Sequence, residues 1–326
     1  MAEKADVVLI GVPKKLIVDA LNGPFNLHVL PNNSEAEAII ARAGANVRAA
    51  AVTGAPDVMR ADMIARFPKL EIISSFGVGY DNVDFKYAAD NKIVVCNTPE
   101  VLNEEVADTA LGLLLCTVRE FPQAERHLRD GHWVRGDYRL SRASLRDRTV
   151  GLVGMGRIGQ AIARRLEAMR VPVVYHSRRP AAGVSYKHFP DLVDMARQVD
   201  ILLAITPGGP HTRNLINAEV LAALGPEGIF INMARGSVVD QPALIKALQD
   251  KVIMSAGLDV YAGEPEVPAE LTAMDHVVLF PHLGSASVAT RAAMDQLVVD
   301  NLLAWNAGKP PLTPVAETPW PPKPRS

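Results

Sequence analysis

The chain contains few cysteines, little net charge and no long apolar run, and each of these features excludes some classes of protein. Its two cysteines, Cys96 and Cys116, lack the spacing of metal ligands, so we expect buried thiols in a reducing, cytoplasmic compartment and no metal site. A formal net charge of −2 offers no general field for nucleic acid or an anionic membrane. No stretch of 18 uninterrupted apolar residues exists, so no membrane span is expected. The charged N-terminus leads into a strand pattern and not into a signal-peptide core.

Short apolar segments alternate with helical patterns, which is typical of βαβ units and a parallel sheet. The expected strands are 6–11, 47–52, 70–74 and, in a six-strand pattern that restarts at 148, strands ending near 153, 176, 205, 233, 258 and 280. Helical patterns cover 59–67, 101–121 and 286–306. The last 18 residues contain seven prolines, which excludes a helix or central strand and predicts an extended surface tail.

The most informative motif is G-x-G-x-x-G at residues 154–159. It follows the apolar run Val150–Val153 and precedes an Ala/Ile/Leu-rich helical pattern. Glycines at these places permit a tight turn, a close approach to a pyrophosphate and close packing of helix on strand, while the helix N-terminus faces the phosphates. We therefore expect a dinucleotide to contact Gly154, Met155, Gly156, Arg157, Ile158 and Gly159.

The end of the second strand of this unit lacks an acidic residue. An Asp or Glu about 20 residues past the motif would bind the ribose 2′-hydroxyl of NAD, but this chain has Ser177, Arg178 and Arg179 there. Arginine suits a 2′-phosphate, because its planar fork makes charge-assisted contacts. The sequence therefore favours NADPH over NADH; the alternative is that these arginines only face water.

Three polar residues directly follow expected strands of the mid-chain module. They are Arg235, Glu264 and His282, and strand ends of an open parallel sheet converge on the ligand crevice. A cation polarises a 2-keto acid, a histidine delivers a proton to the alkoxide, and a carboxylate orients the imidazole in its protonated form. Together they favour a catalytic site for carbonyl reduction over three unrelated surface residues.

These motifs resemble those of the D-isomer-specific 2-hydroxyacid dehydrogenase family over nearly the whole length of the chain. The resemblance rests on Gly-Leu-Val-Gly-Met-Gly-Arg-Ile-Gly, Asn-Met-Ala-Arg-Gly-Ser-Val-Val-Asp, Gly-Leu-Asp-Val-Tyr-Ala-Gly-Glu-Pro and Pro-His-Leu-Gly-Ser-Ala. It implies that Arg235 binds the substrate, Glu264 orients His282, and His282 is the general acid/base. It further assigns Val78, Gly79 and Ser285 to the substrate, and Thr206, Pro207, Ala234 and Asp259 to the cofactor.

The expected architecture is α/β, with two doubly wound parallel-sheet domains and a cleft between them. Residues 1–100 plus 287–326 form a flavodoxin-like substrate-binding domain, because the helical pattern at 286–306 crosses back to the first domain. Residues 101–286 form a Rossmann dinucleotide-binding domain.

The resemblance is to the glyoxylate/hydroxypyruvate reductase branch, whose members form homodimers. Trp133, after the long helix, matches a residue that reaches the partner's active site in this branch. The alternative is that Trp133 only forms part of the dimer interface. The leading hypothesis is NADPH-dependent reduction of glyoxylate and hydroxypyruvate. A bulkier 2-keto acid, such as hydroxyphenylpyruvate or 2-ketogluconate, and a dinucleotide-sensing corepressor role remain alternatives.

Overall fold

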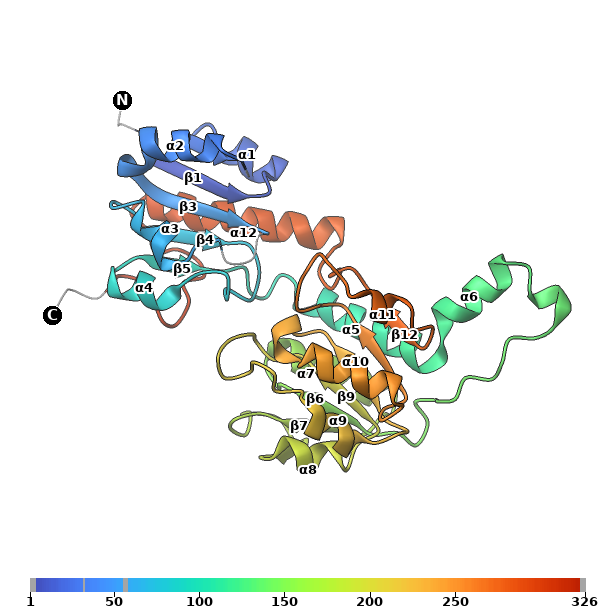
Figure 1. Cartoon of the computed structure of the whole chain (residues 1–326). Helices are drawn as coiled ribbons and strands as arrows, with labels where there is room; N and C mark the ends of the chain where they lie inside the picture. The colour runs from blue at the N-terminus through green and yellow to red at the C-terminus, as the bar shows by residue number, and fades with distance from the viewer. Residues whose placement is uncertain (1–3, 32, 55–57, 323–326) are drawn as a thin grey trace. The chain divides into compact units, whose positions relative to one another are not determined.

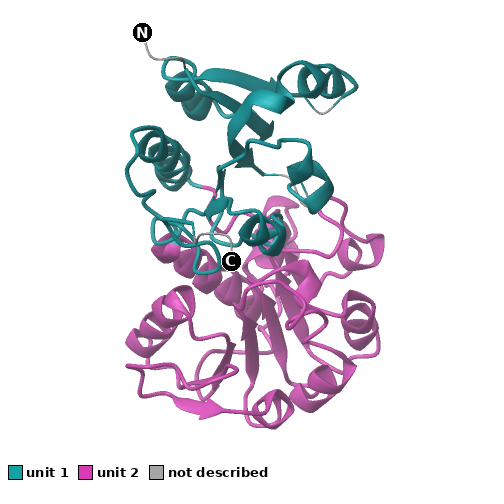
Figure 2. Ribbon diagram, turned by 90° about the vertical axis from the view of Figure 1, so that its left-hand side faces the viewer, with its two compact units in different colours: residues 1–102, 287–326 teal, residues 103–286 magenta. Residues whose placement is uncertain are grey.

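The computed structural model describes residues 4–31, 33–54 and 58–322, and the chain divides into two compact units (Figure 2). Unit 1 comprises Met1–Leu102 and Ser287–Ser326, and unit 2 comprises Asn103–Ala286. Each unit contains a parallel sheet with helices packed on it, so the α/β prediction with two parallel-sheet domains is confirmed.

Unit 1 has a five-stranded sheet in the order β2-β1-β3-β4-β5, with every neighbouring pair parallel. The strands are β1 (Asp6–Gly11), β2 (Asn26–Leu30), β3 (Val47–Thr53), β4 (Ile72–Ser75) and β5 (Val94–Cys96). Its helices are α1 (Lys15–Leu21), α2 (Glu35–Ala43), the short 3-10 helix η1 (Gly44–Asn46), α3 (Ala61–Ala65), α4 (Phe85–Asp90) and α12 (Val288–Asn306).

The last helix of the chain completes unit 1. Helix α12 packs against β3, β4 and α1, and the buried Ser74 hydroxyl donates to the carbonyl of Val298 over 3.1 Å. Residues of α2, α3 and α4, including Ile40, Ile64 and Ala88, form a hydrophobic core with Val8 and Ile73 of the strands. Apolar strands buried on both faces account for the near-continuous hydrophobic runs in the sequence.

Unit 2 has a seven-stranded parallel sheet in the order β12-β11-β10-β9-β6-β7-β8. Its strands are β6 (Val150–Val153), β7 (Val173–His176), β8 (Lys187–Phe189), β9 (Ile201–Ala204), β10 (Ile229–Asn232), β11 (Ser255–Leu258) and β12 (Val277–Leu279). Its helices are α5 (Asn103–Arg119), α6 (Phe121–Arg129), η2 (Trp133–Arg135), α7 (Arg157–Ala168), α8 (Leu192–Ala196), α9 (Ala218–Leu224), η3 (Gly236–Val238), α10 (Gln241–Gln249) and α11 (Ala269–Thr272). The strand order reverses between β9 and β6, which is where such sheets bind ligands.

Three edge strands were not predicted from the sequence, and one predicted helix is broken. Strands β2 and β8 carry polar residues and lack the apolar runs of central strands, and β5 is apolar but only three residues long. The expected helix 101–121 ends at Arg119, because Glu120 adopts a left-handed backbone (φ 56°). Its carboxylate accepts hydrogen bonds from Tyr138 (2.7 Å) and Arg139 (2.8 and 3.0 Å).

Helix α6 and the residues after it extend away from the sheet of unit 2 (Figure 1). We call residues 121–140 the arm. Its large apolar side chains are strongly exposed: Phe121 47%, Leu128 54%, Trp133 60%, Val134 90% and Leu140 92%.

The proline-rich tail was expected to lie extended on the surface, and that prediction is wrong for its middle part. Val315 and Thr318 are buried at 5% exposure, and Pro314 forms an antiparallel bridge with Cys96 of β5. Proline fits there because it donates no amide to the ladder. In the part of the chain that the structure describes, no helix has the length and apolar character to cross a membrane.

Candidate active site

The glycine motif forms the turn between β6 and α7, and each glycine meets a different requirement. Gly154 has a positive φ of 113°, and a Cβ on Gly159 would lie 2.4 Å from the carbonyl oxygen of Gly154. A Cβ on Gly156 would meet nothing within 4 Å, so this backbone is open to an approaching ligand. The geometry is that of a phosphate-binding turn at a helix N-terminus.

The other residues assigned to the cofactor in this region surround the same turn. A Cβ on Gly154 would lie 3.1 Å from the amide nitrogen of Thr206, which places the loop after β9 beside the motif. Pro207 follows and its carbonyl accepts a hydrogen bond from Thr212 (2.7 Å). Met155 is buried, whereas Arg157 is exposed and Ile158 half-buried in the first turn of α7.

The Ser177–Arg179 segment forms a closed turn after β7. The Ser177 hydroxyl donates to the carbonyl of Arg179 over 2.6 Å, and the side chains of Arg178 and Arg179 are exposed. His188 of β8 approaches the Ser177 carbonyl to 2.9 Å, and the Tyr175 hydroxyl accepts from the amide of Ala181 (3.0 Å). Both ends of this turn are therefore positioned by the side chains of neighbouring strands.

Glu264 and His282 form an acid–base pair. His282 Nδ1 lies 2.7 Å from Glu264 Oε2, and the other carboxylate oxygen accepts from the amide of Tyr261 (2.9 Å). Because the carboxylate pairs with Nδ1, the remaining nitrogen, Nε2, is the one that can exchange a proton with a substrate. His282 has a left-handed backbone, with φ 52°, and its side chain is 47% exposed.

The charges around Glu264 favour its ionised form. Burial raises the pKa of Glu264, but the hydrogen bonds from His282 and Tyr261 and the positive charges of His282 and Arg235 lower it below the ordinary value. An ionised carboxylate at this place accepts a hydrogen bond from Nδ1 of His282 and so fixes the orientation of the ring. Arg235 therefore contributes to the electrostatics of the pair.

Arg235 reaches this place because the loops after β10 and β11 pack closely. A Cβ on Gly236 would lie 1.9 Å from the carbonyl carbon and oxygen of Tyr261, so only glycine fits there. Arg235 is half-buried and its Nη1 donates to the carbonyl of Ala234 (2.8 Å). Ala234 is itself buried, with 3% exposure.

Asp259 connects the end of β11 to the loop that carries His282. Its carboxylate accepts from the amides of Leu283 (2.8 Å) and Gly284 (3.0 Å), and its carbonyl accepts from the His282 amide (2.9 Å). Burial raises the pKa of Asp259, and those two amides oppose the rise. Ser285 is half-buried and follows in the same loop, in a turn closed between Ala286 and Leu283.

Tyr261 is a structural member of the site that the sequence analysis did not assign. Its hydroxyl lies 2.9 Å from the carbonyl of Phe280 and 3.1 Å from that of Leu258, so it joins the ends of β11 and β12. Tyr261 lies between Asp259 and Glu264, in a motif that the sequence analysis had singled out. Its contact with Phe280 could not be predicted, because Phe280 follows a different strand.

In unit 1, the turn after β4 presents backbone amides. Gly77 has φ 135° and exchanges hydrogen bonds with Thr98, both of 2.9 Å. The Asn97 side chain donates to the carbonyl of Val78 (2.7 Å). Among the described residues, no acceptor binds the amides of Val78 and Gly79, so the pair is available to an anion.

Trp133 lies apart from these groups, on the arm. Its indole nitrogen donates to Asp137 over 3.3 Å. With 60% of its surface exposed, it makes no part of the Glu264–His282 site within one chain.

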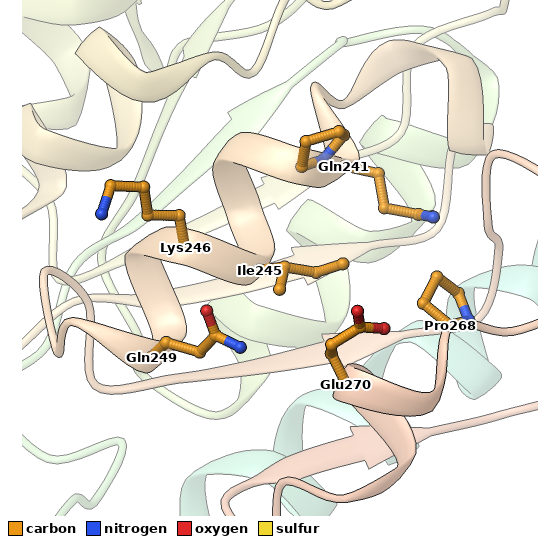
Figure 3. A pocket seen from close by; sticks show the side chains of 7 residues that line it. Gln241, Ile245, Lys246, Gln249, Pro268 and Glu270 are labelled. Carbon is orange, nitrogen blue, oxygen red and sulfur yellow. The ribbon is translucent and has the colours of Figure 1, made fainter.

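Two hollows on unit 2 differ in their chemistry. One of about 270 Å³ adjoins the acid–base pair and is mostly apolar; it is lined by Tyr261, Glu264, Pro265, Val267, Thr272, Leu279, Phe280, Pro281 and His282. The other, of about 460 Å³, lies between α10 and α11 and contains no histidine (Figure 3). The first is therefore the one beside the candidate chemistry. Residues 4–31, 33–54 and 58–322 contain no metal-binding group of three or more His, Cys, Asp or Glu.

A family comparison agrees with this arrangement. The model of the "D-isomer specific 2-hydroxyacid dehydrogenase, NAD binding domain" matches residues 111–284. The chain belongs to the D-isomer specific 2-hydroxyacid dehydrogenase family. The resemblance stated from the sequence motifs is thereby confirmed.

Several members of this family are similar to the chain over most of its length. A Sinorhizobium meliloti NADPH-dependent glyoxylate/hydroxypyruvate reductase, solved with NADP and malonate, is 49% identical with a TM-score of 0.93, covering 99% of this chain and 100% of that one. Glyoxylate/hydroxypyruvate reductase A of Arabidopsis thaliana is 45% identical over 255 residues, covering 78% of this chain and 81% of the relative. Hydroxyphenylpyruvate reductase of Plectranthus scutellarioides has the same identity and coverage.

The lowered pKa of Glu264 predicts how this dehydrogenase responds to acid. A carboxyl whose pKa is lower in the folded than in the unfolded state stabilises the fold above its unfolded pKa, and the contribution is lost as pH falls through the folded pKa. Glu264→Gln should therefore lower the free energy of unfolding at neutral pH. Its deficit relative to wild type should shrink as pH falls below the ordinary value of 4.5.

Denaturant unfolding at a series of pH values measures this deficit. Glu266→Gln, on an exposed carboxylate of the same loop, is the matched control. A deficit for Glu264→Gln that is the same at neutral and acid pH contradicts the assignment.

Proposed function

We propose that this protein reduces small 2-keto acids, glyoxylate and hydroxypyruvate first, to D-2-hydroxy acids with NADPH. The observation that carries the proposal is the 2.7 Å contact between His282 Nδ1 and Glu264 Oε2. It lies in a unit that also contains an open glycine turn at a helix N-terminus. The proposal is supported by the reductases of this substrate class that are 45 and 49% identical to the chain.

Each proposed step belongs to a named side chain. Arg235 binds the keto acid and polarises its carbonyl, since a guanidinium stabilises the negative charge that develops on oxygen. His282 donates a proton to that oxygen from Nε2. Glu264 keeps the imidazole oriented through its contact with Nδ1. The amides of Val78 and Gly79 bind the substrate carboxylate, and Ser285 also contacts the substrate.

The cofactor-binding residues fit NADPH. When bound, NADPH supplies the hydride that reduces the carbonyl carbon. The Gly154–Gly159 turn binds the pyrophosphate, while Thr206, Pro207, Ala234 and Asp259 line the cofactor. Ser177 avoids the repulsion that a carboxylate would exert on a 2′-phosphate, and Arg178 and Arg179 provide positive charge for it. The closed, braced turn that carries both arginines supports this assignment.

A bulkier 2-keto acid is the second candidate substrate. The apolar hollow of about 270 Å³ beside His282 favours a substrate with an apolar side chain. The 45% identity to hydroxyphenylpyruvate reductase points the same way. Comparing kcat/KM for glyoxylate, hydroxypyruvate and hydroxyphenylpyruvate decides between the two candidates.

We further propose a homodimer that forms through the arm. Several large apolar side chains of the arm are strongly exposed, Val134 and Leu140 above all. Such a concentration of exposed apolar side chains is typical of an interaction surface and suits a self-complementary interface. Trp133 reaches the partner's active site in this arrangement. Both thiols are free, which is consistent with a cytoplasmic location. Cys96 is buried as expected, whereas Cys116 is only half-buried, contrary to the expectation of two buried thiols.

The first prediction concerns the proton donor. His282→Asn should lower kcat by about 10²–10⁴, the usual contribution of a positioned general acid. NADPH affinity, measured by fluorescence titration, should stay within about twofold of wild type, because His282 is not assigned to the cofactor. A variant with wild-type kcat overturns the mechanism.

The second prediction concerns cofactor choice. One Arg–phosphate contact contributes about 1.5–3 kcal/mol, or roughly a 10- to 150-fold preference for NADPH in kcat/KM. The double change Ser177→Asp with Arg178→Ala should turn the preference toward NADH. The control is Arg197→Ala. Arg197 caps the end of α8 four residues before the start of β9 and so lies on the side of the amino ends of the strands, whereas Ser177 follows the carboxyl end of β7. A wild-type enzyme that prefers NADH refutes the assignment.

The third prediction concerns the arm. Trp133→Ala should raise KM for the keto acid while the dimer persists, and Val134→Asp with Leu140→Asp should weaken the dimer by placing charge in an apolar interface. Sizing chromatography combined with steady-state kinetics separates these effects. If Trp133→Ala dissociates the dimer but keeps its KM, Trp133 is an interface residue only.

A further inference from the structure

The middle of the C-terminal tail adds an antiparallel segment to the edge of the unit 1 sheet. We call residues 313–318 the tail segment. The amide of Asn97 donates to the carbonyl of Thr313 (3.3 Å), and the amide of Val315 donates to that of Val95 (2.8 Å). The Thr318 hydroxyl accepts from the Val95 amide (2.8 Å). The segment therefore covers the otherwise open edge of β5.

Thr313 joins this segment to the interior of unit 1. Its hydroxyl donates to the carbonyl of Asn97 over 2.6 Å and accepts from the side chain of Asn301 over 2.9 Å. The Asn301 side-chain oxygen in turn accepts from the Thr313 amide (3.0 Å). Asn301 is fully buried in α12, so this network is protected from competing water.

The same network continues into the turn after β4. The side chain of Asn97, which is 8% exposed, donates to the carbonyl of Val78 over 2.7 Å. A continuous series of hydrogen bonds thus runs from Asn301 through Thr313 and Asn97 to Val78. Its last member lies in the turn whose amides are available to an anion.

A second contact connects the turn after β4 to the tail segment. The Tyr80 hydroxyl donates to the carboxylate of Glu317 over 3.0 Å. Burial and this carboxylate raise the pKa of Tyr80 to about 12, so the hydroxyl keeps its proton and remains a donor. Residues 78 and 80 are therefore both connected to the tail segment.

We propose that two residues of the tail segment, Thr313 and Glu317, are positioning residues for the amides of Val78 and Gly79. Their role is to orient two N–H groups toward the carboxylate of the 2-keto acid. Orientation matters because a preorganised donor pair binds an anion without first losing backbone entropy. This inference rests on the proposed function, since that function supplies the carboxylate.

The test is a pair of identical substitutions at two places of the tail segment. Thr313→Val removes the hydroxyl that contacts Asn97, whereas Thr318→Val removes one that contacts only the backbone of Val95. Thr313→Val should raise KM for the keto acid about three- to tenfold, the effect of one hydrogen bond. KM for NADPH should stay unchanged in both variants, and Thr318→Val should keep the wild-type KM for the keto acid.

The Glu317 contact is tested by a double-mutant cycle. Tyr80→Phe and Glu317→Ala should each raise KM for the keto acid, and the double variant should be no worse than the poorer single one, because both changes remove the same hydrogen bond. Fully additive effects on KM, or no effect of either change, overturn this half of the proposal.

Amide hydrogen exchange keeps the inference separable from the proposed function. Thr313→Val should speed exchange of residues 77–80 selectively, and Thr318→Val should not, whether or not any keto acid is reduced. A wild-type protein that reduces no 2-keto acid refutes the proposed function alone. Equal KM values and equal exchange of the turn in wild type and Thr313→Val refute the role of the tail segment.

Discussion

The geometry of the candidate active site depends most on the hydrogen bonds of one buried carboxylate. Asp259 accepts the amides of Leu283 and Gly284 on its side chain and the amide of His282 on its carbonyl. These bonds join the loop after β11 to the loop after β12. They matter because neither loop begins with a helix or strand that would hold it in place. Glu264 lies in the loop after β11, only five residues after Asp259. The position in which Asp259 holds the loop after β12 therefore sets the distance between Glu264 and His282. Tyr261, bonded to Phe280, reinforces the same junction.

The central architecture could be predicted from the sequence because its determinants are local. Strand, glycine turn and helix follow one another in residues 150–168, and the close approach of Gly159 to Gly154 needs no distant residue. The edge strands β2 and β8 escaped prediction because they are partly solvated and carry histidine, asparagine or lysine in place of an apolar run, and β5 escaped it because its apolar run is only three residues long. The end of α5 escaped it for another reason: the partners of Glu120 are Tyr138 and Arg139, far along the chain.

Residue types at strand ends predicted Arg235, Glu264 and His282 as catalytic candidates, and the structure brings the last two into contact. The supporting residues could not be found in this way. Gly236 reads as an ordinary glycine until the backbone of Tyr261 is seen against it. Asn97 and Thr313 are separated by more than two hundred residues, yet two hydrogen bonds join them. Such pairings belong to the tertiary structure, and no periodicity or spacing in one sequence records them.

The chain leaves unit 1 at Leu102 and returns to it at Ser287, and this interruption has a consequence for biosynthesis. Unit 2 is one continuous stretch, so the ribosome delivers all of it before unit 1 is complete. The β-strands of unit 1 are synthesised before unit 2, but two of their packing partners are synthesised after it. One is α12, in which the Val298 carbonyl accepts a hydrogen bond from the buried Ser74 hydroxyl, and the other is the tail segment, which borders β5. Because domains fold as units during synthesis, unit 1 is begun before unit 2 and finished after it, and its turn after β4 acquires its full set of hydrogen bonds only once all of unit 2 has been translated.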